Sequence, residues 1–314
     1  MSGLRIEQPG LLSLLQDQGR FGQSQLGLTT GGPADGEAFR WANALLGNAP
    51  GSCCLEVTMG GLQLTMLQAS RIAVCGAAMA LRINQQPQPL WQSHSVQQGD
   101  VIELEMTTAG LRSYLAVDGG FQLTAQFGST STVLREGIGG IDGGKLQAGQ
   151  QLAIGASQGK PNWHLPEAFR PDYQAPLTLR LIEGYQSDDF SHPSKQRFYQ
   201  HQFKVSRQSD RMGYRLEGPA LSCQRRSMLS EGICYGAVQI PPDGQPIVLL
   251  TDRQTLGGYP KLGSVLSLDC WQLAQRSAGA ELHFEAISME QAHNALHLAE
   301  QQFQRRLQQL QSVD

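Results

Sequence analysis

The segment from Val205 to Gly263 concentrates charged residues among glycines and prolines. It reads VSRQSDRMGYRLEGP and then LSEGICYGAVQIPPDGQPIVLLTDRQTLGGYPKLG. Glycine permits close backbone approach and proline fixes φ, so the charged groups are held on stiff turns. Charged groups on a rigid scaffold often bind ligands, which is one interpretation of each Asp-Arg dipeptide. A surface ion pair without a ligand explains each dipeptide about as well.

The two Asp-Arg dipeptides should lie close together. Ile247 to Leu250 is a short apolar strand that ends abruptly in charge, and Gly257-Gly258 then turns the chain. We therefore expect Asp252-Arg253-Gln254 and Lys261 on loops at one end of a β-barrel, near Asp210-Arg211.

Two segments in the first half of the chain carry similar groups. Asp17 and Arg20 are spaced by a glycine in LLQDQGRFGQ, which fits either a salt-bridged turn or a binding site. Residues 129–132 are Ser-Thr-Ser-Thr and precede Arg135, a combination able to hold a carboxylate or a phosphate. Turns rich in serine and threonine are also common without ligands.

Other chemical motifs are weak. GGIDGGK at 139–145 has the spacing of a phosphate loop, but Leu146 replaces the expected Ser or Thr and no helix pattern follows, so a glycine-rich hairpin is expected. His293 and His297 could share a metal, but solvent-facing histidines are the better interpretation, and we predict no metal site. The sequence contains no GxSxG motif, although a triad can still assemble in space.

The composition is that of an ordinary globular protein. The chain has 314 residues, 40% hydrophobic and 16% charged, and a formal net charge of −3, which gives no reason to bind nucleic acid or an acidic membrane. The N-terminus lacks signal-peptide features and the longest apolar run is too short for a membrane span, so we expect a cytoplasmic protein. The six cysteines contain no CxxC pair and are expected to be buried free thiols.

The elements that position these residues are mainly β-strands. Apolar residues occupy every second position at 62–66, 101–106, 177–183 and 281–287, with turn signals between them. We expect an N-terminal β domain at 1–160 with a helix at 35–47, a linker at 161–176 and a β-barrel domain at 177–287. A capped amphipathic helix is predicted at 288–314, with its stripe of Ala292, Leu296, Phe303, Leu307 and Leu310 packed against protein.

Several phrases together carry a family resemblance. They are QDQGRFG at 16–22, GGPAD at 31–35, RWANALLGN at 40–48, LEVTMGG at 55–61, YLAVDGGF at 114–121, SDRMGYRLEG at 209–218 and the segment from 229 to 263 quoted above. The chain resembles the KipA family, also called allophanate hydrolase subunit 2, the biotin-dependent carboxyltransferase-like family and the C subunit of the bacterial 5-oxoprolinase. Two loops depart from the family: Thr130 replaces a frequent arginine, and GPAD replaces GAMD.

The resemblance implies two cyclophilin-like β-barrel domains. It also implies an ATP-dependent 5-oxoprolinase completed by two further proteins, one KipI-like (its B subunit) and one LamB/YcsF-like (its A subunit), with ATP bound in the complex. Whether magnesium takes part stays open. The alternatives are a carboxyltransferase component that uses carboxybiotin from a partner protein, and a non-catalytic antagonist of a KipI-like kinase inhibitor. The chain lacks an Ala-Met-Lys-Met biotinylation site, so no covalent biotin is expected on it.

The family motifs fall on specific residues of this chain. The candidates for catalysis are Asp210, Arg211, Glu231, Asp252, Arg253, Gln254 and Lys261. The candidates for binding substrate or nucleotide are Asp17, Arg20, Asp35, Ser209, Gly257 and Gly258. The basic groups would stabilise negative charge that develops during lactam opening, a carboxylate would act as base, and Gln254 would orient water or substrate.

Overall fold

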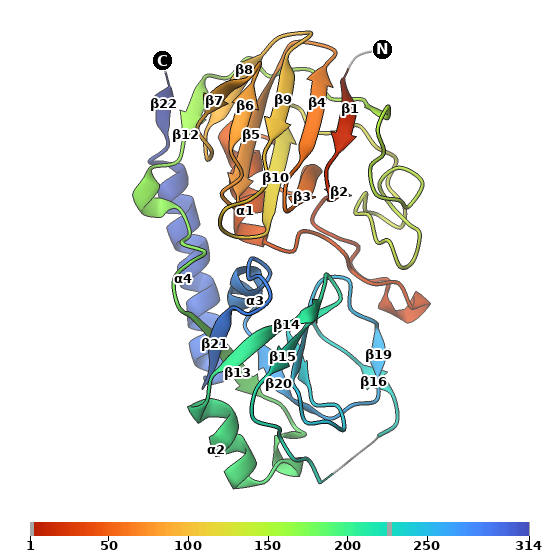
Figure 1. Cartoon of the computed structure of the whole chain (residues 1–314), viewed down its shortest axis with the longest axis vertical. Helices are drawn as coiled ribbons and strands as arrows, with labels where there is room; N and C mark the ends of the chain where they lie inside the picture. The colour runs from red at the N-terminus through yellow and green to blue at the C-terminus, as the bar shows by residue number, and fades with distance from the viewer. Residues whose placement is uncertain (1–2, 225–227, 314) are drawn as a thin grey trace. The chain divides into compact units, whose positions relative to one another are not determined.

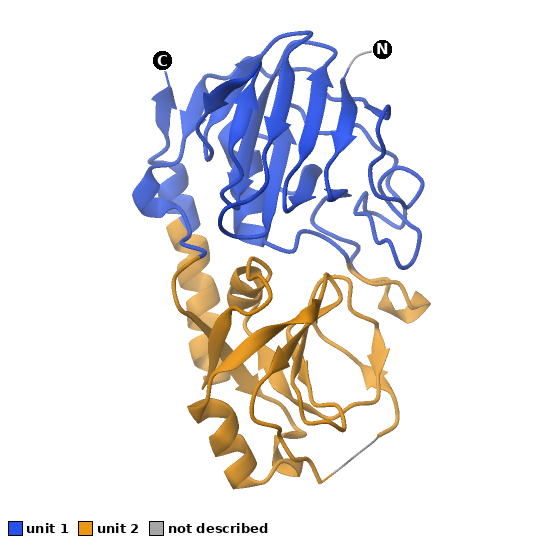
Figure 2. Cartoon of the chain, viewed as in Figure 1, with its two compact units in different colours: residues 1–21, 31–173, 303–314 blue, residues 22–30, 174–302 orange. Residues whose placement is uncertain are grey.

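The computed structural model of the chain describes residues 3–224 and 228–313 and divides the chain into two compact units (Figure 2). Unit 1 contains residues 1–21, 31–173 and 303–314, and unit 2 contains residues 22–30 and 174–302. Strands make up most of the regular structure of both units, which confirms the mainly β prediction (Figure 1). One unit boundary, after Tyr173, falls within the segment expected as a linker.

The helix predicted at 35–47 is present and has the expected caps. The helices are α1 (Gly36–Leu46), α2 (His192–Gln200), α3 (Ser267–Leu273) and α4 (Met289–Leu307). The Asp35 carboxylate accepts hydrogen bonds from the backbone N–H groups of Glu37 (3.0 Å) and Ala38 (3.2 Å). Gly47 ends α1 at φ 67°, in the left-handed conformation that glycine adopts without strain.

Two β-sheets form unit 1. The first has the strand order β11 (Gln151–Leu152), β1 (Leu4–Pro9), β4 (Leu62–Met66), β9 (Val101–Leu104), β6 (Leu81–Ile83) and β7 (Gln86–Gln88). The second has the order β2 (Leu12–Gln16), β3 (Cys54–Thr58), β10 (Arg112–Val117), β5 (Ser70–Gly76) and β8 (Ser93–Val96). Hydrogen bonding thus divides the strands of unit 1 between two sheets, whereas the closed barrel is found in unit 2.

The five-stranded sheet is covered on both faces. On one face, Leu115 of β10 packs in the same core as Leu64 of the six-stranded sheet. On the other face, Tyr114 packs in a second core with Trp41 of α1. Successive residues of a strand point to opposite faces, so β10 is buried along its whole length and unit 1 has three layers.

Unit 2 contains a closed seven-stranded barrel. Its order is β13 (Leu177–Glu183), β20 (Lys261–Val265), β17 (Ala237–Gln239), β18 (Ile247–Leu249), β15 (Gly213–Glu217), β14 (Phe203–Ser209) and β21 (Glu281–Ala286). Phe198 of α2 packs on Phe203 and Phe284, with ring centroids 5.5 and 4.2 Å apart. A separate two-stranded ladder joins β16 (Glu231–Gly232) to β19 (Leu256–Gly257), beside the barrel in Figure 1.

The end of the chain confirms the predicted capping box, but α4 ends at Leu307, and β22 (Gln311–Val313) lies within the range predicted as helix, 288–314. The backbone N–H of Ser288 donates to Oε1 of Gln291 (2.8 Å), and the N–H of Gln291 donates to Oγ of Ser288 (3.1 Å). Within the stripe, Ala292 is buried and Phe303 packs on Trp41, but Leu296 is 38% exposed. None of the helices in the described ranges has the length and apolar character needed to cross a membrane.

The segment expected as a linker also contains regular structure. Strand β12 (Asn162–His164) pairs antiparallel with β22 (Gln311–Val313), which follows α4. Both strands belong to unit 1. The pairing joins residues almost 150 positions apart, beyond the reach of local sequence patterns.

Candidate functional site

The two Asp-Arg dipeptides meet, as the sequence predicts. Arg211 Nε lies 2.8 Å from Asp252 Oδ2, and Arg211 Nη2 lies 3.0 Å from Asp252 Oδ1. Both side chains are less than a tenth exposed. The Asp252 N–H also donates to the Arg211 carbonyl (2.9 Å). This buried two-point ion pair joins the β14–β15 turn to the loop after β18, an arrangement that suits a structural role.

Asp210 caps the same turn. Its Oδ1 accepts hydrogen bonds from the backbone N–H groups of Met212 (2.7 Å) and Gly213 (3.3 Å). On β14, Ser209 Oγ donates to the Arg215 carbonyl at 3.5 Å. The catalytic role of Asp210 and the binding role of Ser209 stay predictions, because their contacts are local backbone contacts.

Glu231 and Lys261 form an ion pair where the β16–β19 ladder meets the barrel. Tyr185 donates its hydroxyl to Glu231, and Gln186 Nε2 donates to Glu231 Oε1 (2.6 Å). The hydrogen bonds from Lys261 and Tyr185 lower the pKa of Glu231. Glu231 is therefore a carboxylate at neutral pH, suited to positioning Lys261 and ill suited to donating a proton.

A pocket of about 330 Å³ lies next to the same ladder, within unit 2. Its lining residues are Ser24, Leu28, Thr29, Thr30, Gly232, Ile233, Cys234, Arg253, Gln254 and Thr255. Thr29 Oγ1 donates to the Arg253 carbonyl (2.6 Å), so residues 22–30 are fastened to the loop after β18. The pocket brings together Arg253 and Gln254, two of the predicted catalytic residues.

The two glycines of β19 and its following turn are tightly enclosed. A Cβ on Gly257 would lie 2.3 Å from Ile233 Cδ1 and 2.7 Å from Gln239 Nε2. A Cβ on Gly258 would lie 3.0 Å from the Met228 carbonyl oxygen. A side chain at either position would require its neighbours to shift, so glycine at both positions has a packing reason, and their ligand-binding role stays a prediction.

The other binding candidates lie in unit 1. Asp17 accepts hydrogen bonds from Ser129 Oγ and Ser131 Oγ (both 2.6 Å) and from the Thr130 N–H (2.6 Å). Burial raises the pKa of Asp17, but these hydrogen bonds together lower the pKa by more than burial raises it. The pKa of Asp17 therefore lies below its usual value. The hydroxyl groups expected to hold a carboxylate or phosphate thus hold a carboxylate of the chain itself.

Arg20 and Asp35 are also enclosed by the chain. Arg20 is 1% exposed and donates to the carbonyls of Gln126 (3.0 Å) and Ser131 (3.2 Å). The contacts of Asp17 and Arg20 thus fasten residues 126–131, and the expected salt-bridged turn is replaced by this network. Asp35, besides capping α1, accepts a hydrogen bond from Tyr173 Oη (2.6 Å).

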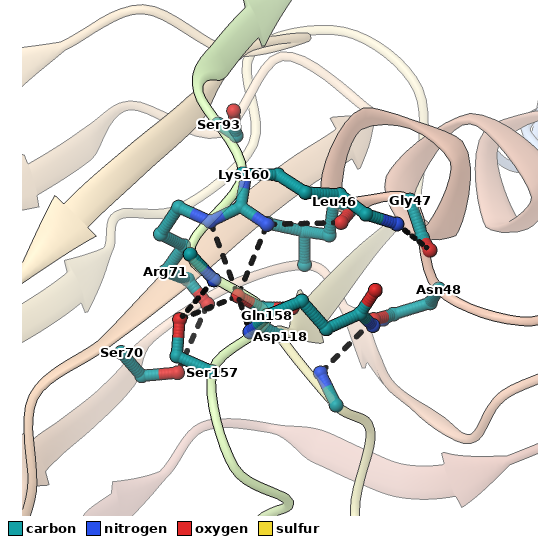
Figure 3. Close-up of polar contacts among 12 residues, drawn as sticks. Leu46, Gly47, Asn48, Ser70, Arg71, Ser93, Asp118, Ser157, Gln158 and Lys160 are labelled. Atoms are coloured by element: carbon teal, nitrogen blue, oxygen red, sulfur yellow. Dashed lines mark hydrogen bonds and ion pairs between the residues drawn. The ribbon is translucent and has the colours of Figure 1, made fainter.

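Sequence reasoning missed a second buried ion pair, in unit 1 (Figure 3). Arg71 donates from Nε (3.1 Å) and Nη2 (3.0 Å) to Asp118 Oδ2, which also accepts from Ser157 Oγ (2.7 Å). Arg71 Nη2 donates to the carbonyl of Leu46, the last residue of α1 (3.0 Å), and Lys160 Nζ donates to the carbonyl of the C-cap Gly47 (2.8 Å). A signal was present in the sequence, because Arg71 directly precedes the long apolar run at 72–81, and a charge within a buried strand needs a partner.

The structure also places the glycine-rich motif and the cysteines. Ile141 and Gly144 form a β-bridge and no helix follows Lys145, so GGIDGGK is a glycine-rich turn as predicted. All six cysteines are free, and Cys53, Cys54, Cys75 and Cys270 are buried. The expectation of burial is wrong for Cys234, which is exposed at the pocket, and for Cys223, which is half-buried. In the described ranges, no three His, Cys, Asp or Glu residues are grouped to hold a metal ion.

Comparisons with known proteins agree with this architecture. A family model described as carboxyltransferase domain, subdomain A and B, matches residues 26–286. The chain is 37% identical to the 5-oxoprolinase C subunit of Haemophilus influenzae over 88% of this chain and 89% of that protein. It is 35% identical to the 5-oxoprolinase C subunit of Escherichia coli over 93% and 94% of the two proteins.

A solved structure extends the likeness to a larger protein. The K. lactis urea amidolyase superposes with a TM-score of 0.90 at 25% identity over 97% of this chain. The match covers 20% of the amidolyase chain, so this chain corresponds to about one fifth of that protein.

Proposed function

This chain belongs to the carboxyltransferase domain family, subdomain A and B, and on that premise we propose that it is one subunit of an ATP-dependent 5-oxoprolinase. The complex would open 5-oxoproline to L-glutamate and hydrolyse ATP. The observation that carries the proposal is the similarity to two proteins named as the C subunit of 5-oxoprolinase, along about nine tenths of each protein. A match of that extent includes both units, whereas a shared module would match only one.

The chemistry requires more than this chain supplies. A five-membered lactam is an unstrained amide, so its opening needs carbonyl activation and an energy source. Phosphorylation of the amide oxygen by ATP would supply both, and the developing negative charge would need preorganised cations. Residues 139–145 do not fit a phosphate loop, because a helix N-terminus is missing after them. We therefore assign ATP to the assembled complex and not to these glycines.

The proposed partners are a KipI-like protein and a LamB/YcsF-like protein, the B and A subunits of the complex. The names of the two similar proteins describe each of them as a subunit, which supports an assembly. In that assembly, Arg253 and Lys261 would supply positive charge and Gln254 would orient water or substrate. Each of these three side chains lies at or beside the β16–β19 ladder of unit 2.

Reconstitution tests the proposal directly. The chain is co-expressed with the two partner proteins of its own source, purified, and assayed for ATP-dependent release of glutamate from 5-oxoproline. We expect turnover by the assembly of all three proteins and none when ATP is omitted. A purified assembly that releases no glutamate with ATP refutes the proposal.

The structural likeness to urea amidolyase favours a second candidate, a carboxyltransferase component. Its substrate would be carboxybiotin carried by a partner protein. Incubation of the same assembly with a carboxylated biotin carrier separates the two candidates: loss of the carboxyl group from the carrier to an added amide acceptor supports the carboxyltransferase, and its retention supports the 5-oxoprolinase.

A further inference from the structure

We propose that the unit 2 pocket at Arg253 is a binding site for a small carboxylate, and that Arg253 is the residue that recognises the carboxylate group. The choice of 5-oxoproline as that carboxylate rests on the proposed function. The site itself depends only on the charge, the size and the lining of the pocket.

The charge of Arg253 has no counter-ion among the residues that the structure describes. Its side chain donates from Nε to the Ile233 carbonyl and from Nη1 to the Leu250 carbonyl, both at 3.3 Å. Asp252 acts on Arg253 electrostatically but forms its direct ion pair with Arg211, and Glu231 pairs with Lys261. Two neutral carbonyls and the Tyr235 ring, whose centroid lies 5.8 Å from the guanidinium carbon, orient the guanidinium without neutralising it.

Burial makes this charge costly. The loss of water around Arg253 lowers the pKa of its guanidinium, although nearby groups such as Cys234 and Tyr235 oppose the effect. A desolvated cation gains more from an anionic ligand than a solvated one, because the anion offsets a solvation loss that folding has already imposed. Nη2 makes no hydrogen bond within the described part of the chain and is available to a ligand.

The pocket fits a small molecule with one anionic group. Its volume of about 330 Å³ lies at the lower end of the range for small-molecule sites, roughly 300–1,000 Å³. Leu28 and Ile233 give it an apolar part, and Gln254 and Thr255 give it polar groups. A guanidinium matches the two oxygens of a carboxylate, so a small ring bearing one carboxylate satisfies both the apolar and the charged part.

Cys234 provides a reporter in the same pocket. Its thiol is exposed, whereas Cys53, Cys54, Cys75 and Cys270 are buried, and Cys223 lines a different pocket. Iodoacetamide alkylates a thiolate by displacing iodide, and its rate depends on access to the sulfur. A ligand that fills the pocket therefore slows alkylation of Cys234, and Cys223 serves as the internal control.

The test measures alkylation of each cysteine in the full chain by mass spectrometry. We expect 5-oxoproline to slow alkylation of Cys234 by at least about threefold at saturation, and the neutral ring 2-pyrrolidinone to have no such effect at equal concentration. In Arg253→Gln, the 5-oxoproline concentration needed for half protection should rise at least about tenfold. Arg207→Gln replaces an exposed arginine of β14 and should behave as wild type.

The outcomes separate this inference from the proposed function. If the isolated chain shows no protection, the measurement is repeated on the assembled complex, and the absence of protection in both overturns the inference even if the complex is active. Equal protection by 2-pyrrolidinone, or protection unchanged in Arg253→Gln, also overturns it. Protection that depends on Arg253 in an assembly without 5-oxoprolinase activity keeps the carboxylate site and refutes the proposed function.

Discussion

Replacement of Asp252 by asparagine should destabilise unit 2 by about 3–5 kcal/mol, the usual cost of removing one partner from a buried ion pair. The substitution keeps the shape of the side chain but leaves the Arg211 guanidinium, 7% exposed, without its two-point carboxylate partner. At this size of domain, such a loss corresponds to a fall in melting temperature of roughly 10 °C or more. Urea unfolding followed by circular dichroism measures the change in the free energy of unfolding.

The neighbouring residue is the matched control. Arg253→Gln removes a charge whose partners are two carbonyls and the Tyr235 ring, and it should change the free energy of unfolding by no more than about 1 kcal/mol. The double substitution Arg211→Met with Asp252→Leu should recover much of the stability that Asp252→Asn loses, because it leaves no buried charge. If the melting temperature of Asp252→Asn lies within about 2 °C of wild type while that of Arg253→Gln is clearly lower, then Arg253 and not Asp252 is the structural residue, and the assigned roles are wrong.

Three further outcomes are expected. The purified single chain should show negligible ATP-dependent glutamate release, and robust turnover would contradict an incomplete site. Burial and the nearby Asp35 raise the pKa of Glu37 to about 7, so its folded state favours the protonated form. The stability from this group is complete below about pH 4.5 and is lost as the pH rises through 7. Scanning fluorimetry should therefore show that Glu37→Gln raises the melting temperature at pH 8 and leaves it unchanged near pH 4.5; equal effects at both pH values would sink this account. Asp17→Ala should free residues 126–131 for limited proteolysis, because it removes the acceptor of Ser129 and Ser131, and an unchanged cleavage pattern would show that the contacts of Arg20 hold the loop without Asp17.

Local patterns predicted α1, the start of α4 and several strands, but not α2, α3 or the β12–β22 pair. Asp35 and Gly47 mark both ends of α1, and Ser288 with Gln291 marks the start of α4, because a cap is decided by residues within one turn. Alternation in LTLRLIE likewise predicts β13, whose residues alternate between the barrel core and more exposed positions.

The partners of the charged residues could not be predicted from the sequence in the same way. The motifs indicated that Asp210-Arg211 and Asp252-Arg253 lie together, but not that Arg211 pairs with Asp252 while Arg253 has no counter-ion in the described part of the chain. Asp17 bonds to hydroxyl groups more than 100 positions away, and no periodicity encodes such a contact. Pairing of this kind is decided by tertiary packing, so residue type predicted that partners exist without predicting which.

The pairing of β12 with β22 has a consequence for synthesis. Residues 174–302 form most of unit 2, and their barrel can close once they have left the ribosome. The folding of unit 1 is completed later, because β22 and Phe303, which contacts Trp41, are synthesised after residues 174–302. Premature termination after residue 302 would therefore release a chain that has every barrel strand and still exposes part of the apolar core of unit 1 to chaperones.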